Sequence, residues 1–172
     1  MQGVTRALPL LTLLTLATTV ALAGCAVPGS VDGIFHSDPF TLRATSPLTK
    51  PTASGRDRLV VLAENDSETL STVSLHLVGF DEMPVNEAVD VGTGAFADHR
   101  SSIEVVVGEG AVVDTRADGV ELLSSKDPVR SASTGGRITI TEKTAQQTSG
   151  EFHVKLDDGG YLDGVFTAFP EQ

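Results

Sequence analysis

The segment GEFHVKLDDGGYLDGVF, residues 150–166, decides the fold that the sequence predicts. On either side of its centre, apolar and polar residues alternate, which is typical of a strand with one buried face. The central Asp-Asp-Gly-Gly contains the Asp-Gly pair that tight turns favour where the backbone needs positive φ. The segment therefore predicts a β-hairpin with residues 157–160 as its turn.

Two Gly-x-Phe triplets flank this turn, Gly150 with Phe152 before it and Gly164 with Phe166 after it. Residues two apart in a strand share a face, so each glycine leaves a gap beside its own phenylalanine. A bare glycine on a sheet face gives room to an aromatic ring from the neighbouring strand. We therefore expect the two triplets to pack against each other across the hairpin.

Strand patterns of the same kind occur upstream of the hairpin. Alternating or β-branched runs, bounded by turn residues, cover residues 40–45, 59–64, 72–80, 88–91, 103–107, 111–115, 120–123 and 137–142. Residues 47–57 hold Pro, Gly, Ser and Thr and are expected to form a loop. The spacing predicts one antiparallel all-β domain over residues 39–170, either a β-sandwich or a partly open β-barrel.

The amino terminus has the order of an export signal. Residues 1–24 hold one positive charge, Arg6, then an apolar stretch and then small residues. They end in Leu22-Ala23-Gly24, which Cys25 follows directly. Cys25 is the only cysteine of the chain. An exported chain with one cysteine has no internal disulfide partner, so lipid attachment is the natural use of this thiol. The alternatives are an uncleaved anchor helix and a secreted protein with a free thiol.

This run resembles the lipobox of bacterial lipoproteins. The resemblance implies a signal peptide over residues 1–24, cleavage before Cys25, and acyl chains such as palmitate on its sulfur and amine. Each buried methylene contributes about 0.8 kcal/mol, so two or more chains hold a protein stably at a membrane. In such lipoproteins an aspartate directly after the cysteine tends to retain the protein at the inner membrane. Here that residue is Ala26, so the resemblance implies attachment to the outer membrane. Residues 25–38 are then expected to form a flexible tether because they are rich in Pro, Gly, Ser and Asp.

A second resemblance lies near the other end of the chain. Residues 136–168 contain Arg-Ile-Thr-Ile-Thr, Ser-Gly-Glu-Phe and Leu-Asp-Gly-Val-Phe-Thr-Ala. This stretch is similar to the closing strands of certain uncharacterised small β-domain lipoproteins of bacteria. The similarity implies a fold and a location, and it supplies no activity.

The charge balance limits the partners. Removing residues 1–24 from the 172 leaves 148 residues, and because this leader carries Arg6 and no acid, the net charge falls from −11 to −12. Nucleic acid requires a basic face, so nucleic acid is excluded as a partner. Anionic lipid would repel such a domain, so electrostatic docking on a membrane is also disfavoured. The charge itself is explained by the solubility of an exported domain.

Motifs of enzymes and of metal sites are absent from the sequence. It has no nucleophile elbow, paired-histidine zinc helix, paired-cysteine site or phosphate loop. Residues 92–97 fit a loose dinucleotide fingerprint, but a strand pattern follows instead of a helix, so we interpret them as a Gly-rich loop. We predict no catalytic residue, no cofactor and no metal.

Two groups of polar residues were weighed as metal ligands. His76 and His153 would share one side of a sheet only if their strands paired, and the four histidines follow no metal-ligand spacing. Asp157, Asp158 and Asp163 surround the last turn without matching a calcium loop, so we interpret them as turn-forming aspartates.

The sequence favours a non-catalytic cell-envelope lipoprotein whose tethered β-domain binds or supports another envelope component. The alternative is a lipocalin-like carrier of small apolar ligands, and an envelope hydrolase is the third hypothesis. A carrier would line an open pocket with its inward residues, whereas a binding module would fill its interior with them. The inward residues that test this difference are Leu75, Leu77, Phe152 and Phe166.

Overall fold

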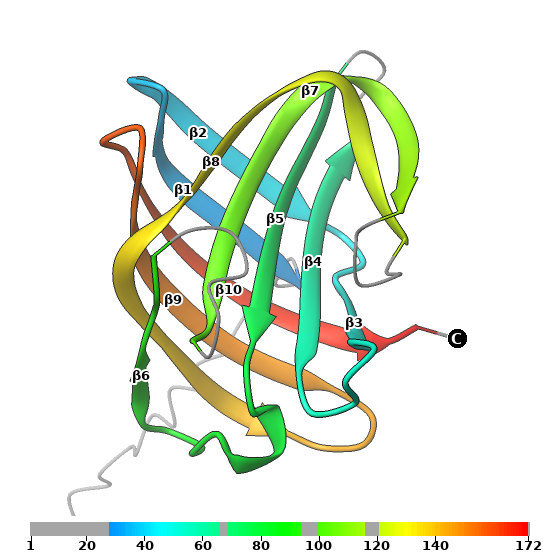
Figure 1. Ribbon diagram of the computed structural model, residues 1–172, viewed down its shortest axis with the longest axis vertical. Helices are drawn as coiled ribbons and strands as arrows, with labels where there is room; N and C mark the ends of the chain where they lie inside the picture. Colours follow the sequence, from blue (N-terminus) through cyan, green and yellow to red (C-terminus); the bar gives the residue numbers. More distant parts are fainter. Residues whose placement is uncertain (1–27, 66–68, 94–99, 116–120, 172) are drawn as a thin grey trace, which may run out of the picture.

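The computed structural model describes residues 28–65, 69–93, 100–115 and 121–171, with the side chains of 110–126 left undescribed. The expected leader and Leu22, Ala23, Gly24 and Cys25 therefore lie outside the described residues. Seven strands close into a β-barrel, and further strands extend it (Figure 1). The all-β prediction is confirmed, with a closed barrel rather than a partly open one.

The ring follows an order that differs from the order of the chain. Around the barrel its strands are β10 (Tyr161–Pro170), β3 (Leu48–Pro51), β4 (Arg58–Asn65), β5 (Thr69–Leu77), β7 (Ser102–Thr115), β8 (Glu121–Lys143) and β9 (Thr148–Leu156). Outside the ring, β1 (Gly29–Phe35) pairs with β10, β2 (Asp38–Ala44) pairs with β1, and β6 (Ala88–Asp90) pairs with β8. A 3₁₀ turn, Phe80–Glu82, follows β5. Among the described strands the pairing is antiparallel except between β10 and β3, where Phe169 faces Leu48 in parallel register.

The first strand corrects the expected tether. Residues 25–38 were expected to be flexible, but from Gly29 onward they form β1, which hydrogen-bonds to β10 on one side and β2 on the other. Val31 is fully buried, so this segment belongs to the core as well as to the sheet. The expected loop over residues 47–57 is likewise interrupted by β3, which is short enough to be hidden in a Pro-rich stretch.

Two long strands replace four expected short ones. The expected strands over 103–107 and 111–115 are joined in β7, and residues 121–123 and 137–142 are joined in β8, which has 23 residues; residue 120 of the expected strand lies outside the described part. The first part of β8 pairs with β7 and the later part pairs with β9. This one strand therefore connects its two neighbours in the ring through different parts of its length. Gly136, at φ 135°, lies against the backbone of Val154, where a side chain would have no room.

The expected hairpin of β9 and β10 is confirmed, and its glycines pack as predicted. Gly150 is the register partner of Phe166, and Gly164 is the register partner of Phe152. A methyl group added to either glycine would overlap the opposite phenylalanine ring. Each ring therefore occupies space that only a glycine across the hairpin leaves open.

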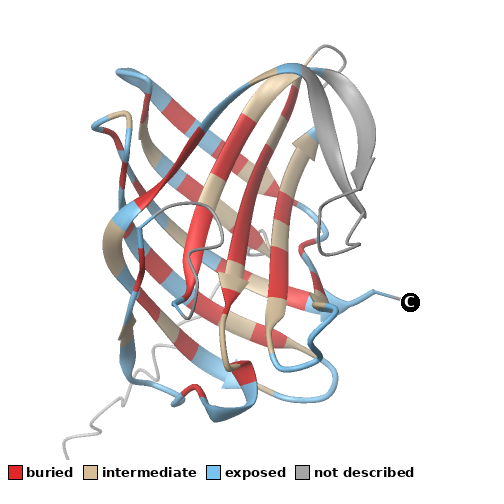
Figure 2. Cartoon of the chain, viewed as in Figure 1, coloured by how far each residue is buried: buried red, intermediate tan, exposed pale blue. Residues whose placement is uncertain are grey.

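The apolar side chains that point into the barrel form one continuous core. Buried and exposed residues alternate along the strands, as Figure 2 shows. The four residues that distinguish a packed interior from a lined pocket all belong to this core and are at most 4% exposed: Leu75, Leu77, Phe152 and Phe166.

Candidate functional site on the outer face

A row of charged residues crosses the outer face of the barrel, with one member on each of five neighbouring strands. The backbone register aligns each member with the next, from β1 through β10, β9 and β8 to β6. Each member has at least one chain neighbour that is buried in the core, so alternation along each strand turns the row outward. The row consists of Asp32, Asp163, His153, Arg137 and Asp90.

An open depression of about 450 Å³ lies over this part of the outer face. The row contributes Asp32, Asp163, His153 and Arg137 to its lining. A second line of register partners adds further residues to the lining: Ser30 of β1, Val165 of β10, Glu151 of β9, Thr139 of β8 and Ala88 of β6. Val165 is half exposed, so an apolar side chain stands among charged ones at this surface.

The charges within the row are partly paired. Nδ1 of His153 lies 2.5 Å from a carboxylate oxygen of Asp163, and both side chains are exposed. Arg43 of β2 donates a hydrogen bond of 2.7 Å to Asp32, and this bond holds the pKa of Asp32 below its ordinary value. Nε of Arg137 lies 3.8 Å from Asp90 at the far end of the row. The row therefore ends in a carboxylate on both β1 and β6, with the Arg137 guanidinium of β8 beside Asp90, and such mixed charge is suited to a charged partner.

The His153–Asp163 pair has the geometry of a base and its orienting carboxylate. Hydrolysis by a serine or threonine mechanism also needs a hydroxyl within hydrogen-bond reach of the histidine. Among the described residues, no such hydroxyl hydrogen-bonds to His153.

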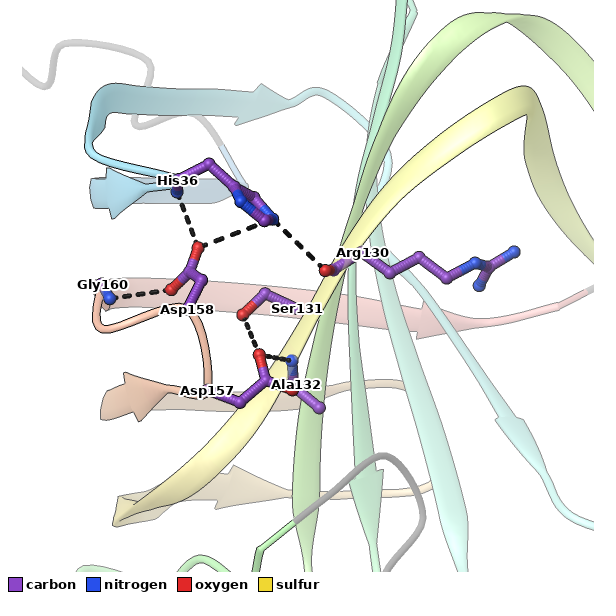
Figure 3. A network of polar contacts seen from close by, with 7 residues as sticks. All are labelled: His36, Arg130, Ser131, Ala132, Asp157, Asp158 and Gly160. Carbon is purple, nitrogen blue, oxygen red and sulfur yellow. Dashed lines mark hydrogen bonds and ion pairs between the residues drawn. The ribbon is translucent and has the colours of Figure 1, made fainter.

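A separate polar network joins the β1–β2 turn, the β9–β10 turn and β8 (Figure 3). Asp158 accepts hydrogen bonds from the backbone N–H of His36, at 2.6 Å, and of Gly160, at 2.7 Å. Nε2 of His36 lies 3.4 Å from the carbonyl oxygen of Arg130 in β8. One carboxylate thus joins the turn between β1 and β2 to the turn between β9 and β10, beside the long strand.

The neighbouring carboxylate, Asp157, completes this network (Figure 3). It accepts a very short hydrogen bond from the Ser131 hydroxyl and another, of 3.1 Å, from the backbone N–H of Ala132. The Ser131 hydrogen bond lowers the pKa of Asp157 from its ordinary value. These bonds give Asp157 and Asp158 a structural role at the turn, as the sequence suggested.

The other residues that the sequence offered as candidate ligands do not come together in one site. His76 lies on β5, 3.5 Å from a carboxylate oxygen of Asp57, and β5 pairs with β4 and β7 but not with the strand of His153. The two histidines therefore do not form a shared site. In the described residues no three His, Cys, Asp or Glu side chains are grouped so that they would hold a metal ion. His99 and residues 94–97 of the Gly-rich fingerprint lie outside the described part.

No protein-family model, curated protein or solved structure matches the chain. Within the described ranges, no helix is long and apolar enough to cross a bilayer. The site is thus defined by its own geometry. The sequence alone did not point to Asp32, Arg137 and Asp90 as site residues, although each lies next to a buried residue in its strand.

Proposed function

We propose that the protein is a non-catalytic, lipid-anchored component of the cell envelope whose barrel binds another envelope component. In this proposal Cys25 carries the lipid, the outer membrane is the site of attachment, and the charged outer face recognises the partner. The observation that carries the binding proposal is the position of the depression. It lies outside the barrel, among Asp32, His153, Arg137 and their neighbours, whereas the inward side chains pack together.

This packing favours the binding hypothesis over the lipocalin-like carrier. A carrier needs inward apolar residues that border an open cavity. Leu75 and Leu77 are instead fully buried in the continuous core, together with Phe152 and Phe166. Barrels of about eight strands either fill with side chains or hold one small ligand, so the burial of these residues, and not the seven strands of the ring, carries the distinction.

The charge pattern indicates how a partner would be recognised. Glu151, Asp163 and Asp32 contribute carboxylates to the lining of the depression, and Arg137 contributes a positive charge. Complementary charges on a partner would set its orientation and accelerate its association. We therefore propose a protein partner with a mixed-charge surface.

The test is recovery of partners with the native lipidated protein, compared with charge-reversed variants. Glu151→Lys and Arg137→Glu are each expected to weaken capture of the specific partner about tenfold. Arg56→Glu is the matched control, because Arg56 is exposed on the loop between β3 and β4, outside the depression. Undiminished capture by both depression variants would refute this surface as the binding site. Turnover of a substrate that depends on His153 would refute the non-catalytic function.

A further inference from the structure

Two exposed apolar side chains lie beside the point where the described chain begins. Leu48 of β3 and Phe169 of β10 are register partners and are 41% and 44% exposed. Pro28 accepts a backbone hydrogen bond from Thr167 at 2.6 Å, and Pro47 accepts one from Phe169 at 3.1 Å. We call Leu48, Phe169 and the exposed Pro170 the anchor-side patch.

The distance along the chain from this patch to Cys25 is short. Cys25 precedes Pro28 by three residues, and three fully extended residues span at most about 11 Å. A lipid on Cys25 would therefore hold Pro28, and with it the anchor-side patch, close to the membrane surface. No long tether separates the barrel from its anchor, because β1 begins at Gly29.

From this geometry we infer that the anchor-side patch docks on the bilayer surface of the membrane to which Cys25 is attached. The inference rests on the proposed lipid anchor and deepens it by giving the barrel a fixed orientation. Aromatic and aliphatic side chains at a protein surface gain free energy when they enter the headgroup boundary. The occupant of the patch is thus a lipid surface.

The charges around the patch are compatible with this contact. Nζ of Lys50 lies 3.5 Å from a carboxylate oxygen of Glu171, so the two charged residues next to the patch pair with each other. The carboxylates of the outer face, Asp32 and Asp163, belong to the row that lies farther along β1 and β10. The patch therefore avoids the repulsion that the acidic body would meet at anionic lipid.

A matched pair of fluorescent probes tests the docking. The chain has no tryptophan, so F169W and Y161W variants of the full lipidated protein each carry a single one. Tyr161 and Phe169 are equally exposed, at 44%, and face outward on the same strand. They are eight residues apart, or about 27 Å along the strand. Each variant is reconstituted in phosphatidylcholine vesicles with and without brominated acyl chains.

Docking predicts that F169W emits at shorter wavelength on the vesicles and is quenched by brominated lipid, while Y161W keeps its solvent-exposed emission. L48W provides a second probe of the same patch and is expected to behave as F169W does. Equal, unquenched emission from all three anchored variants would overturn the docking and leave the anchor intact. Variants that are not retained on vesicles at all, and behave as their Cys25→Ser counterparts do, would overturn the proposed anchor itself.

Discussion

Glycine and phenylalanine form reciprocal pairs across the last hairpin. Gly164 leaves the space that the Phe152 ring fills, and Gly150 does the same for Phe166. This packing was foreseeable, because both triplets and the turn between them are local in the chain. The charged row was not foreseeable, because its members come from five strands and only the register of the folded barrel aligns Asp32 with Asp163.

Replacing Gly164 with alanine is expected to destabilise the barrel. Gly164→Ala adds one methyl group that overlaps the Phe152 ring, so the ring must leave its rotamer. We expect a loss of about 1–3 kcal/mol in the free energy of unfolding, as in other overpacked cores. Denaturant unfolding measures this loss. Val165→Ala, at the next, outward position, is the control and should change stability by less than about 0.5 kcal/mol. An unchanged midpoint for Gly164→Ala would contradict the packing.

The lowered pKa of Asp157 predicts a pH dependence of stability. A carboxyl whose pKa is lower in the folded protein stabilises the fold above its unfolded pKa, near 3.9, and loses this contribution as pH falls through the folded value. The free-energy difference between wild type and Asp157→Asn should therefore be present at neutral pH and shrink in acid. Ser131→Ala removes the principal cause of the shift and should show the same trend. A difference that is constant between pH 7 and strong acid would contradict this assignment.

Local sequence patterns explain which strands could be predicted and which could not. Strand patterns located β4, β5, β9 and β10 because each alternates or is β-branched over its length. No strand was predicted for residues 124–136 of β8, which include Pro128 and Gly135-Gly136, yet pairing first with β7 and then with β9 keeps that stretch extended. Non-local hydrogen bonds thus outweigh local preference there.

The turn between β1 and β2 is a strained element. His36 and Ser37 both have positive φ, 49° and 70°, in a hairpin where Phe35 pairs with Asp38. Such two-residue turns favour Asn-Gly or Gly-Gly because other residues are strained there. Ser37→Gly is expected to stabilise the protein by about 0.5–1 kcal/mol, since the relief of strain exceeds the added freedom of the unfolded chain. Thermal unfolding measures the gain, and Ala53→Gly, at an exposed position of the β3–β4 loop, is the comparison for a general effect of glycine. A lowered melting temperature for Ser37→Gly alone would contradict the strain.

At the scale of the whole molecule, β10 holds the ring together. It pairs with β9 and β1 along most of its length and with β3 at its end. Its outward face carries Tyr161, Asp163, Val165 and Phe169, so one strand contributes to both the depression and the anchor-side patch. A partner bound in the depression would therefore sit close to the membrane surface on which the patch is proposed to dock.

The same strand has a consequence for how the chain acquires its structure. Until β10 is in place, β1 and β2 can pair only with each other, and β3 and β9 each have an open edge. Pairing residue 29 with residue 166 requires almost the whole chain to be present, and such distant contacts form slowly. Nascent molecules thus pass through a stage with unsealed edges, when proteases and self-association compete with ring closure.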